Sequence, residues 1–222
     1  MASAAADEPR ASGHELQLGR VDQVRVRVGY GRTPDGPAYE VFLLDLPEAG
    51  TGGTFDEMPY LEALEPILYA LADAPLDYSV HVDRSRTSWS SAAGDVEIRV
   101  SLTTGSTSTT LGATALDAVT NAFRTVLDLA GPSEPLLLGH DEAIARARAR
   151  VEEAFPEVHS DVLSVSEEEH RAAQGSWSVG LRTRDLDRYL VVVGFLDGYA
   201  GSAHVRHEPR SEVLDAVGSE SP

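Results

Sequence analysis

The sequence predicts an α+β protein in which two repeated strand–strand–(strand)–helix units form a sheet covered by helices, followed by a smaller helix-plus-antiparallel-sheet module. Residues 22–72 and 76–129 share one layout, in which strands are followed by a glycine-containing loop and a covering helix. Apolar residues recur at every second position in the expected strands and at every third or fourth position in the expected helices. The stretch Pro-Ser-Glu-Pro at 132–135 marks a linker, beyond which the composition changes. Coincidence between two ordinary α+β segments remains the alternative to a duplication.

The first unit begins with a hairpin. Val24, Val26 and Val28 alternate with polar residues, which predicts a half-buried strand, and residues 38–46 form its return strand. In the helix that follows, Pro66 predicts a bend or a break, because proline removes a helical hydrogen bond. The apolar face of this helix comprises Leu61, Leu64, Ile67, Leu68 and Leu71.

The second unit repeats this order. Strands are expected at 76–82 and 96–100, and a helix is expected from about 115 to 129. Gly131 and Pro132 end that helix. The buried face of the first strand is expected to carry Leu76, Tyr78, Val80 and Val82.

The C-terminal module is expected to be a helix followed by three or four antiparallel strands. The helix is placed at 140–155, and the strands at 159–165, 177–182, 189–196 and 202–207. A charged loop is expected at 167–175, and Asp197-Gly198 is expected to be a hairpin turn. The resulting domains are 20–131 and 137–208, between disordered ends at 1–19 and 209–222.

The charge of the chain argues against several kinds of partner. Its 18 basic residues are all arginine and face 36 acidic residues, which leaves a net charge of -18. Such a surface repels phosphate backbones and anionic lipid headgroups, so we expect neither nucleic-acid nor membrane binding. The longest apolar run, 189–193, is too short to span a bilayer, and the first residues lack the pattern of a signal peptide. We therefore expect a cytoplasmic protein.

No motif predicts a catalytic site, a metal site or a cofactor. The chain has no cysteine, no G-x-S-x-G elbow and no P-loop lysine. His204 and His207 are three residues apart on an expected strand, so they should point to opposite faces and could not chelate one ion. No catalytic residue is therefore assigned, and the protein is expected not to be an enzyme.

Two loops of small residues could hold a small anionic or zwitterionic ligand. Each precedes a helix, whose first N–H groups can bind a carboxylate. The first loop contains Gly52, Gly53 and Thr54, and the second contains Gly112, Ala113 and Thr114. The alternative is that both loops are merely tight connections.

The segment 76–129 resembles a known family of regulatory domains. Leu76-Asp77-Tyr78-Ser79-Val80-His81-Val82, the following DVEIRVSL strand and the helix LGATALDAVTNAFRTVLDL are similar to the C-terminal regulatory domain of α-isopropylmalate and citramalate synthases. The resemblance covers about residues 20–130, and nothing in the chain resembles the catalytic barrel of those synthases. The first unit departs from the family, which has G-N-G-P before its helix where this chain has Thr51-Gly52-Gly53-Thr54.

The resemblance implies a stand-alone module, commonly a homodimer, that binds a branched-chain amino acid or a 2-oxo acid between its repeats. The ligand-binding residues that it implies are Gly52, Gly53, Tyr78, His81, Gly112, Ala113 and Thr114, and Thr54 lies in the same loop. The second hypothesis is an interaction or assembly protein that keeps this fold without a ligand. The third is an enzyme that uses His81, Asp83 and Arg84 or Arg86.

Overall fold

The computed structural model describes residues 20–31, 38–47, 57–71, 76–85, 95–105, 110–131 and 137–209. The strands are β1 (Arg20–Tyr30), β2 (Tyr39–Asp45), β3 (Leu76–Ser85), β4 (Asp95–Thr104), β5 (Ser164–Arg171), β6 (Ser176–Arg182), β7 (Arg188–Val193) and β8 (Ser202–Glu208). The α-helices are α1 (Met58–Ala70), α2 (Ala113–Ala130) and α3 (His140–Ala154), and short 3-10 helices occupy Ser160–Val162 and Ala172–Gln174. The predicted α+β class is confirmed.

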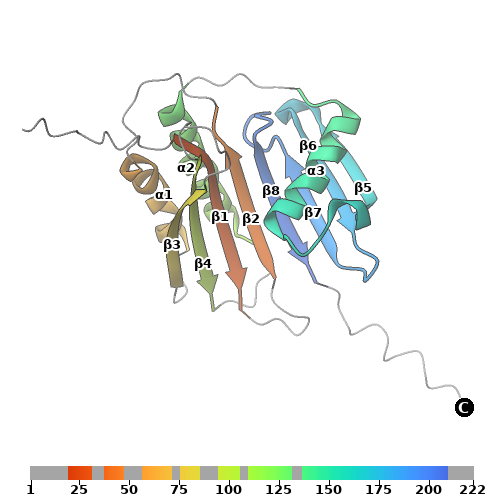
Figure 1. Cartoon of the computed structure of the whole chain (residues 1–222), viewed down its shortest axis with the longest axis horizontal. Helices are drawn as coiled ribbons and strands as arrows, with labels where there is room; N and C mark the ends of the chain where they lie inside the picture. Colours follow the sequence, from red (N-terminus) through yellow and green to blue (C-terminus); the bar gives the residue numbers. More distant parts are fainter. Residues whose placement is uncertain are drawn as a thin grey trace, which may run out of the picture.

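All eight strands of the described residues belong to one sheet, in the order β3-β4-β1-β2-β8-β7-β6-β5 (Figure 1). β1 and β4 run parallel, and every other neighbouring pair runs antiparallel. The chain passes from β2 through α1 and β3 before β4 returns alongside β1. The N-terminal and C-terminal modules therefore meet through the pairing of β2 with β8.

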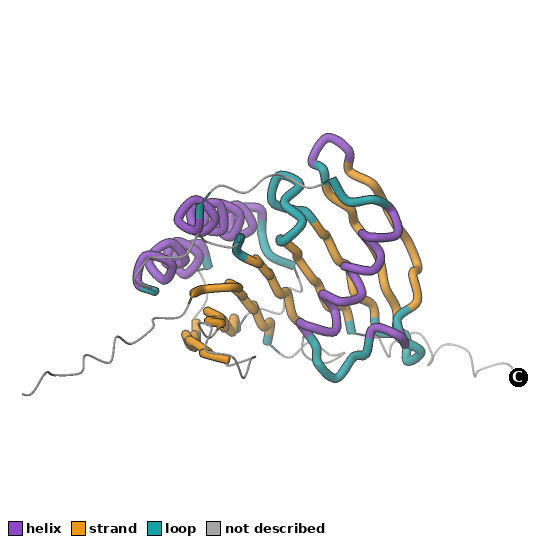
Figure 2. Tube along the Cα trace, turned by 45° about the horizontal axis from the view of Figure 1, so that its top comes forward, coloured by secondary structure: helices purple, strands orange, loops and turns teal. Residues whose placement is uncertain are grey.

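Each half of the sheet is covered by helices on one face, and the two halves use opposite faces. Alternate residues of β2 divide between two cores, with Phe42 and Leu44 in one and Val41 and Leu43 in the other. Helices α1 and α2 lie over the first half of the sheet and α3 lies over the second half (Figure 2). Among the described strands, β2 is thus the one whose side chains enter both cores.

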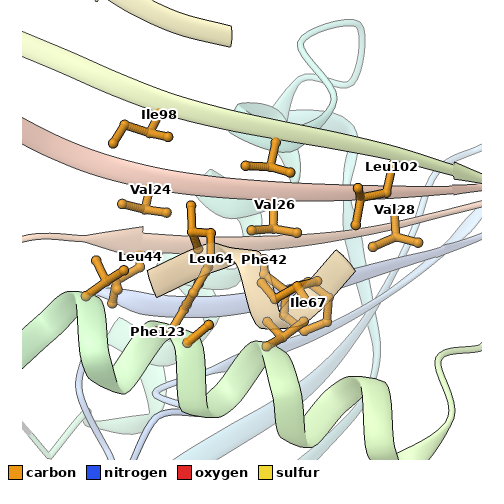
Figure 3. Packing of buried hydrophobic residues seen from close by; sticks show 14 of the residues in the cluster. Val24, Val26, Val28, Phe42, Leu44, Leu64, Ile67, Ile98, Leu102 and Phe123 are labelled. Atoms are coloured by element: carbon orange, nitrogen blue, oxygen red, sulfur yellow. The ribbon is translucent and has the colours of Figure 1, made fainter. Parts of the chain in front are cut away.

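The first core joins the valines of β1 to α1 and α2. Figure 3 shows Val24, Val26 and Val28 in a row facing Leu64 and Ile67 of α1 and Phe123 of α2, which lie below them in this view, as the sequence periodicity predicts. The rings of Phe42 and Phe123 meet edge to face, with 6.5 Å between centroids.

The second core is built under α3. This helix buries Ala143, Ala147 and Val151, and the two alanines let it lie close to the sheet. Leu181, Val191 and other aliphatic side chains of β6, β7 and β8 complete this core.

Three expectations for the C-terminal module are wrong. Residues 160–162 form a 3-10 helix where a strand was expected, and β5 instead spans Ser164–Arg171, including the glutamates placed in a loop. Since β5 is the outermost strand and most of its side chains are exposed, it accepts charged residues. β7 ends at Val193, before the expected 196, because the chain turns at Gly194, whose φ is 71°.

Helix α1 continues through Pro66, so the expected break is absent. The disorder expected at 1–19 and 209–222 concerns residues that, apart from residue 209, lie outside the described ranges. Both N-terminal units consist of two strands and a helix, and their origin by duplication stays a prediction.

The dual role of β2 predicts how core substitutions act. Phe42→Ala is expected to lower the free energy of unfolding by about 3–5 kcal/mol, and Leu43→Ala by about 2–5 kcal/mol, because each leaves a cavity in a different core. Urea unfolding followed by circular dichroism should show one cooperative transition for both variants. Leu137→Ala is the control, since that side chain is 78% exposed. Two separate transitions, each sensitive to only one core variant, would contradict the shared role of β2.

Candidate functional site

The two edges of the sheet differ in how they are protected. β5 has a bulge between Val165 and Glu167, and its three glutamates, Glu167, Glu168 and Glu169, are all exposed. A bulge and charged side chains are the usual means by which an edge strand is kept from pairing with another chain. The β5 edge is therefore blunted.

The opposite edge, β3, lacks a bulge. Its ten residues pair with β4 in one continuous register, from Leu76 opposite Thr104 to Ser85 opposite Asp95. β3 contains no proline. As the last strand in the sheet order, it turns its outer N–H and C=O groups away from the sheet that the structure describes.

The helices that bury the apolar face of the sheet cover it as far as β4 but leave the edge strand β3 exposed. Val100 of β4 is only 4% exposed, whereas Val80, directly opposite it on β3, is 44% exposed. Tyr78, on the same face of β3, is 58% exposed. The sequence predicted that Tyr78 and Val80 would be buried, and that expectation is wrong because β3 lies beyond the helices.

A groove of about 330 Å³ lies between α1 and β3. Its floor and walls are aliphatic, and its volume is close to the lower end of the range for ligand pockets in proteins. The lining residues are Leu61, Leu64 and Leu68 of α1, Val80 of β3, Val100 of β4, and the glutamates Glu62 and Glu65.

The spacing of apolar residues in α1 explains the groove. Leu64 and Ile67 are buried against the first core, while Leu61 and Leu68 flank them at helical spacing and are only partly buried. The apolar stripe of α1 is thus wider than the surface it covers. Its outer margin faces β3 and leaves the groove open.

The polar groups around the groove are hydrogen-bond acceptors. Glu62 and Glu65 are both exposed, and Glu65 accepts one hydrogen bond, from the Tyr69 hydroxyl at 3.3 Å. Pro66 has no N–H, so the Glu62 carbonyl lacks the amide donor that a helix normally supplies four residues later. This rim is negatively charged and rich in acceptors.

The predicted ligand residues do not meet in this groove. Tyr78 shares the β3 face of Val80 but does not line the groove, and His81 sits three residues further along β3 and so points to the other face. Gly112 is the N-cap of α2, and Ala113 and Thr114 begin that helix, exposed and outside the groove lining. Gly52, Gly53 and Thr54 lie outside the described residues.

Sequence reasoning missed the groove because it assigned the whole apolar face of α1 to the core. Nothing in the alternation of β3 distinguishes an edge strand from an inner one. One available signal was the pair Glu62 and Glu65, which sit beside the apolar stripe at helical spacing.

A second polar cluster, around Glu40, is buried and holds the fold together. Glu40 is 1% exposed. Its Oε1 accepts hydrogen bonds from the Tyr30 hydroxyl (3.1 Å) and from the Leu111 amide (2.8 Å). Its Oε2 lies 2.8 Å from Nε2 of His204, whose ring stacks on Phe42. The cluster ties the segment before α2 to β1, β2 and β8.

Two opposing effects act on the pKa of Glu40. Burial raises this pKa, but the hydrogen bond and charge of His204, together with the Leu111 amide and the Tyr30 hydroxyl, lower it more strongly. The net pKa lies below the ordinary value of a glutamate. Burial and the neighbouring Glu40 raise the pKa of Tyr30, so its hydroxyl stays a donor. A lone glutamate in the apolar strand 38–46 was the sequence signal for this cluster.

No protein-family model and no curated protein matches the sequence, and no solved structure matches the fold. The resemblance to regulatory domains of the synthases therefore stays an expectation. Across the described ranges, no three histidine or carboxylate side chains gather as a metal site. None of the helices described is long and apolar enough to cross a membrane.

The Glu40 cluster predicts a dependence of stability on pH. A lowered carboxyl pKa adds stability above the ordinary pKa of about 4.3, and this stability is lost as the pH falls through the lowered value. Glu40→Gln removes the charge while keeping the shape, so it should lower the free energy of unfolding at pH 7 by about 1.5–3 kcal/mol. It should also weaken the loss of stability on acidification, measured by urea unfolding from about pH 7 down to about pH 2, because the loss occurs below the ordinary carboxyl pKa.

Glu157→Gln, at an exposed position, is the control and should behave as the wild type. If Glu40→Gln lost as much stability on acidification as the wild type, the assignment of this pH dependence to Glu40 would be wrong.

Proposed function

We propose that this protein is a non-catalytic interaction protein that holds a segment of another polypeptide in the groove between α1 and β3. The observation that carries the proposal is the end of the apolar cover at β4, which leaves Val80 and Tyr78 exposed on an edge strand that has no bulge and no proline. The lining of aliphatic side chains and two exposed carboxylates suits binding rather than chemistry.

A polypeptide matches this surface better than a small molecule does, because the edge and the groove offer different contacts side by side. The β3 edge offers backbone donors and acceptors, and the groove offers apolar area for side chains. An extended segment can use both at once, which is how many peptide-binding domains recognise their partners. Fully burying one aliphatic or aromatic side chain contributes about 1.5–3 kcal/mol.

The amino-acid or 2-oxo-acid effector fits the groove less well. Its carboxylate would approach Glu62 and Glu65, which carry the same charge. The exposed start of α2 at Gly112, Ala113 and Thr114 does not line the groove, so one small ligand could not use both. Effector binding and a homodimer both stay predictions from the resemblance.

Selection from a peptide display library tests the proposed function. Val80→Glu places a charge in the groove at a position that is already partly exposed, so the fold should persist. Peptides enriched on the full wild-type chain are expected to lose binding to Val80→Glu, because a carboxylate there would have to be desolvated.

Leu137→Glu is the matched control, since it adds the same charge at a side chain that is 78% exposed and outside the groove. Both variants are first checked for an unchanged melting temperature. The proposal fails if no peptide is enriched, or if the enriched peptides bind Val80→Glu as tightly as the wild type.

A further inference from the structure

The rim of the groove carries negative charge without a matching cation on the two helices. α1 contains Glu62 and Glu65 and no basic residue. The one basic residue of α2 is Arg124, which already pairs with Asp197 at 3.0 Å. A partner that brings arginine or lysine would meet two carboxylates that form no ion pair with the residues that the structure describes.

The backbone at the rim, like the two carboxylates, favours a partner that donates hydrogen bonds. The Glu62 carbonyl lacks its helical donor because of Pro66, and it lies in the same helical turn as the Glu65 carboxylate. Arginine has only donors, arranged in a fork, and can serve a carboxylate and a carbonyl together. Its apolar stem can also lie over Val80 while the guanidinium reaches the rim.

Side chains along a strand point alternately to the two faces of the sheet, and this decides which residues of an added strand reach the groove. In a strand added beside β3, every second side chain projects to the face that carries Tyr78 and Val80, towards α1. The others project to the face of Asp77, Ser79 and His81, which are all exposed. The segment that fits therefore has apolar and basic residues on one face and small polar residues on the other.

A second copy of this chain is a poor occupant. Antiparallel pairing of two β3 strands with the helices on one face would bring two acidic rims, each with Glu62 and Glu65, to the same seam. The chain also carries a net charge of -18. Like charges oppose this association, whereas a basic partner is attracted.

We propose that a basic, extended segment of another protein adds to the sheet as a strand beside β3, with apolar side chains in the groove and arginine or lysine side chains on Glu62 and Glu65. This inference rests on the proposed function and specifies its partner. Backbone hydrogen bonds to alternate residues of β3 set the position of the segment, and the acidic rim selects its charge.

Three synthetic peptides test this chemistry on the full chain. The first, acetyl-RTVTVTR-amide, places arginine and valine on one face and threonine on the other. The second replaces both arginines with glutamate, and the third repeats the first with its central three amides N-methylated, which blocks both edges of the strand. Affinities are measured by isothermal titration calorimetry at low and high salt.

The first peptide is expected to bind at least roughly tenfold more tightly than either control, and the difference from the acidic peptide should shrink at high salt. The double variant Glu62→Gln/Glu65→Gln should weaken its binding by roughly threefold to tenfold. Asp117→Asn/Asp128→Asn makes the same change of net charge on exposed positions of α2 outside the groove, and should leave the affinity unchanged.

Other outcomes overturn the inference in distinguishable ways. If the N-methylated peptide bound as tightly as the first, side chains alone would hold the segment and strand addition would be rejected. If the acidic peptide bound as tightly as the first, the proposal that Glu62 and Glu65 select a basic partner would be rejected. Failure of all three peptides would reject this partner chemistry, while the display selection would still decide whether the groove binds polypeptides at all. A stable dimer in light scattering that Val80→Glu converts to monomer would place a second copy in the groove instead.

Discussion

Strand β2 is the element on which the rest of the structure depends. It pairs with β1 on one side and β8 on the other, and its alternating side chains enter both cores. A strand buried on both faces in the middle of a sheet leaves little freedom of register, because a slip of one residue would exchange the two apolar sets. The buried Glu40 adds a polar anchor at the same strand, since its partners come from β1, β8 and the segment before α2.

This arrangement explains why β3 is left uncovered. Helix α2 is held over the centre of the sheet by Phe123, which contacts Phe42 of β2 and also Phe195 of the turn after β7, at 6.2 Å between ring centroids. The C-terminal module thus contributes to the core under α2 and keeps this helix towards β2. Helix α1 packs beside α2 over β1 and β4, and no described helix covers β3. An open edge next to an apolar groove follows from where the two cores are joined.

Much of the fold could be predicted from local patterns, and the site could not. The alternating valines of β1 identified a buried face correctly, because in an inner strand with one covered face the side chains are buried at every second position. Tyr78 and Val80 show the same period on β3 and are exposed, since strand order is set by long-range pairing that no local pattern contains. The glutamates of β5 were assigned to a loop for the same reason, as only the edge position makes a charged strand acceptable. Glu62 and Glu65 could be assigned to a binding surface only after the structure showed that α1 borders an open groove.

Hydrogen exchange tests most directly the claim that a partner segment adds to the β3 edge. Amide exchange over residues 76–85 is compared in the full chain alone and with saturating acetyl-RTVTVTR-amide, with residues 164–171 of the opposite edge as the internal reference. The β3 amides facing away from β4 are expected to exchange more slowly with the peptide, because a new strand hydrogen-bonds them, and β5 is expected to be unchanged. Unchanged exchange in β3 at saturation, or slowing confined to β5, would contradict the claim.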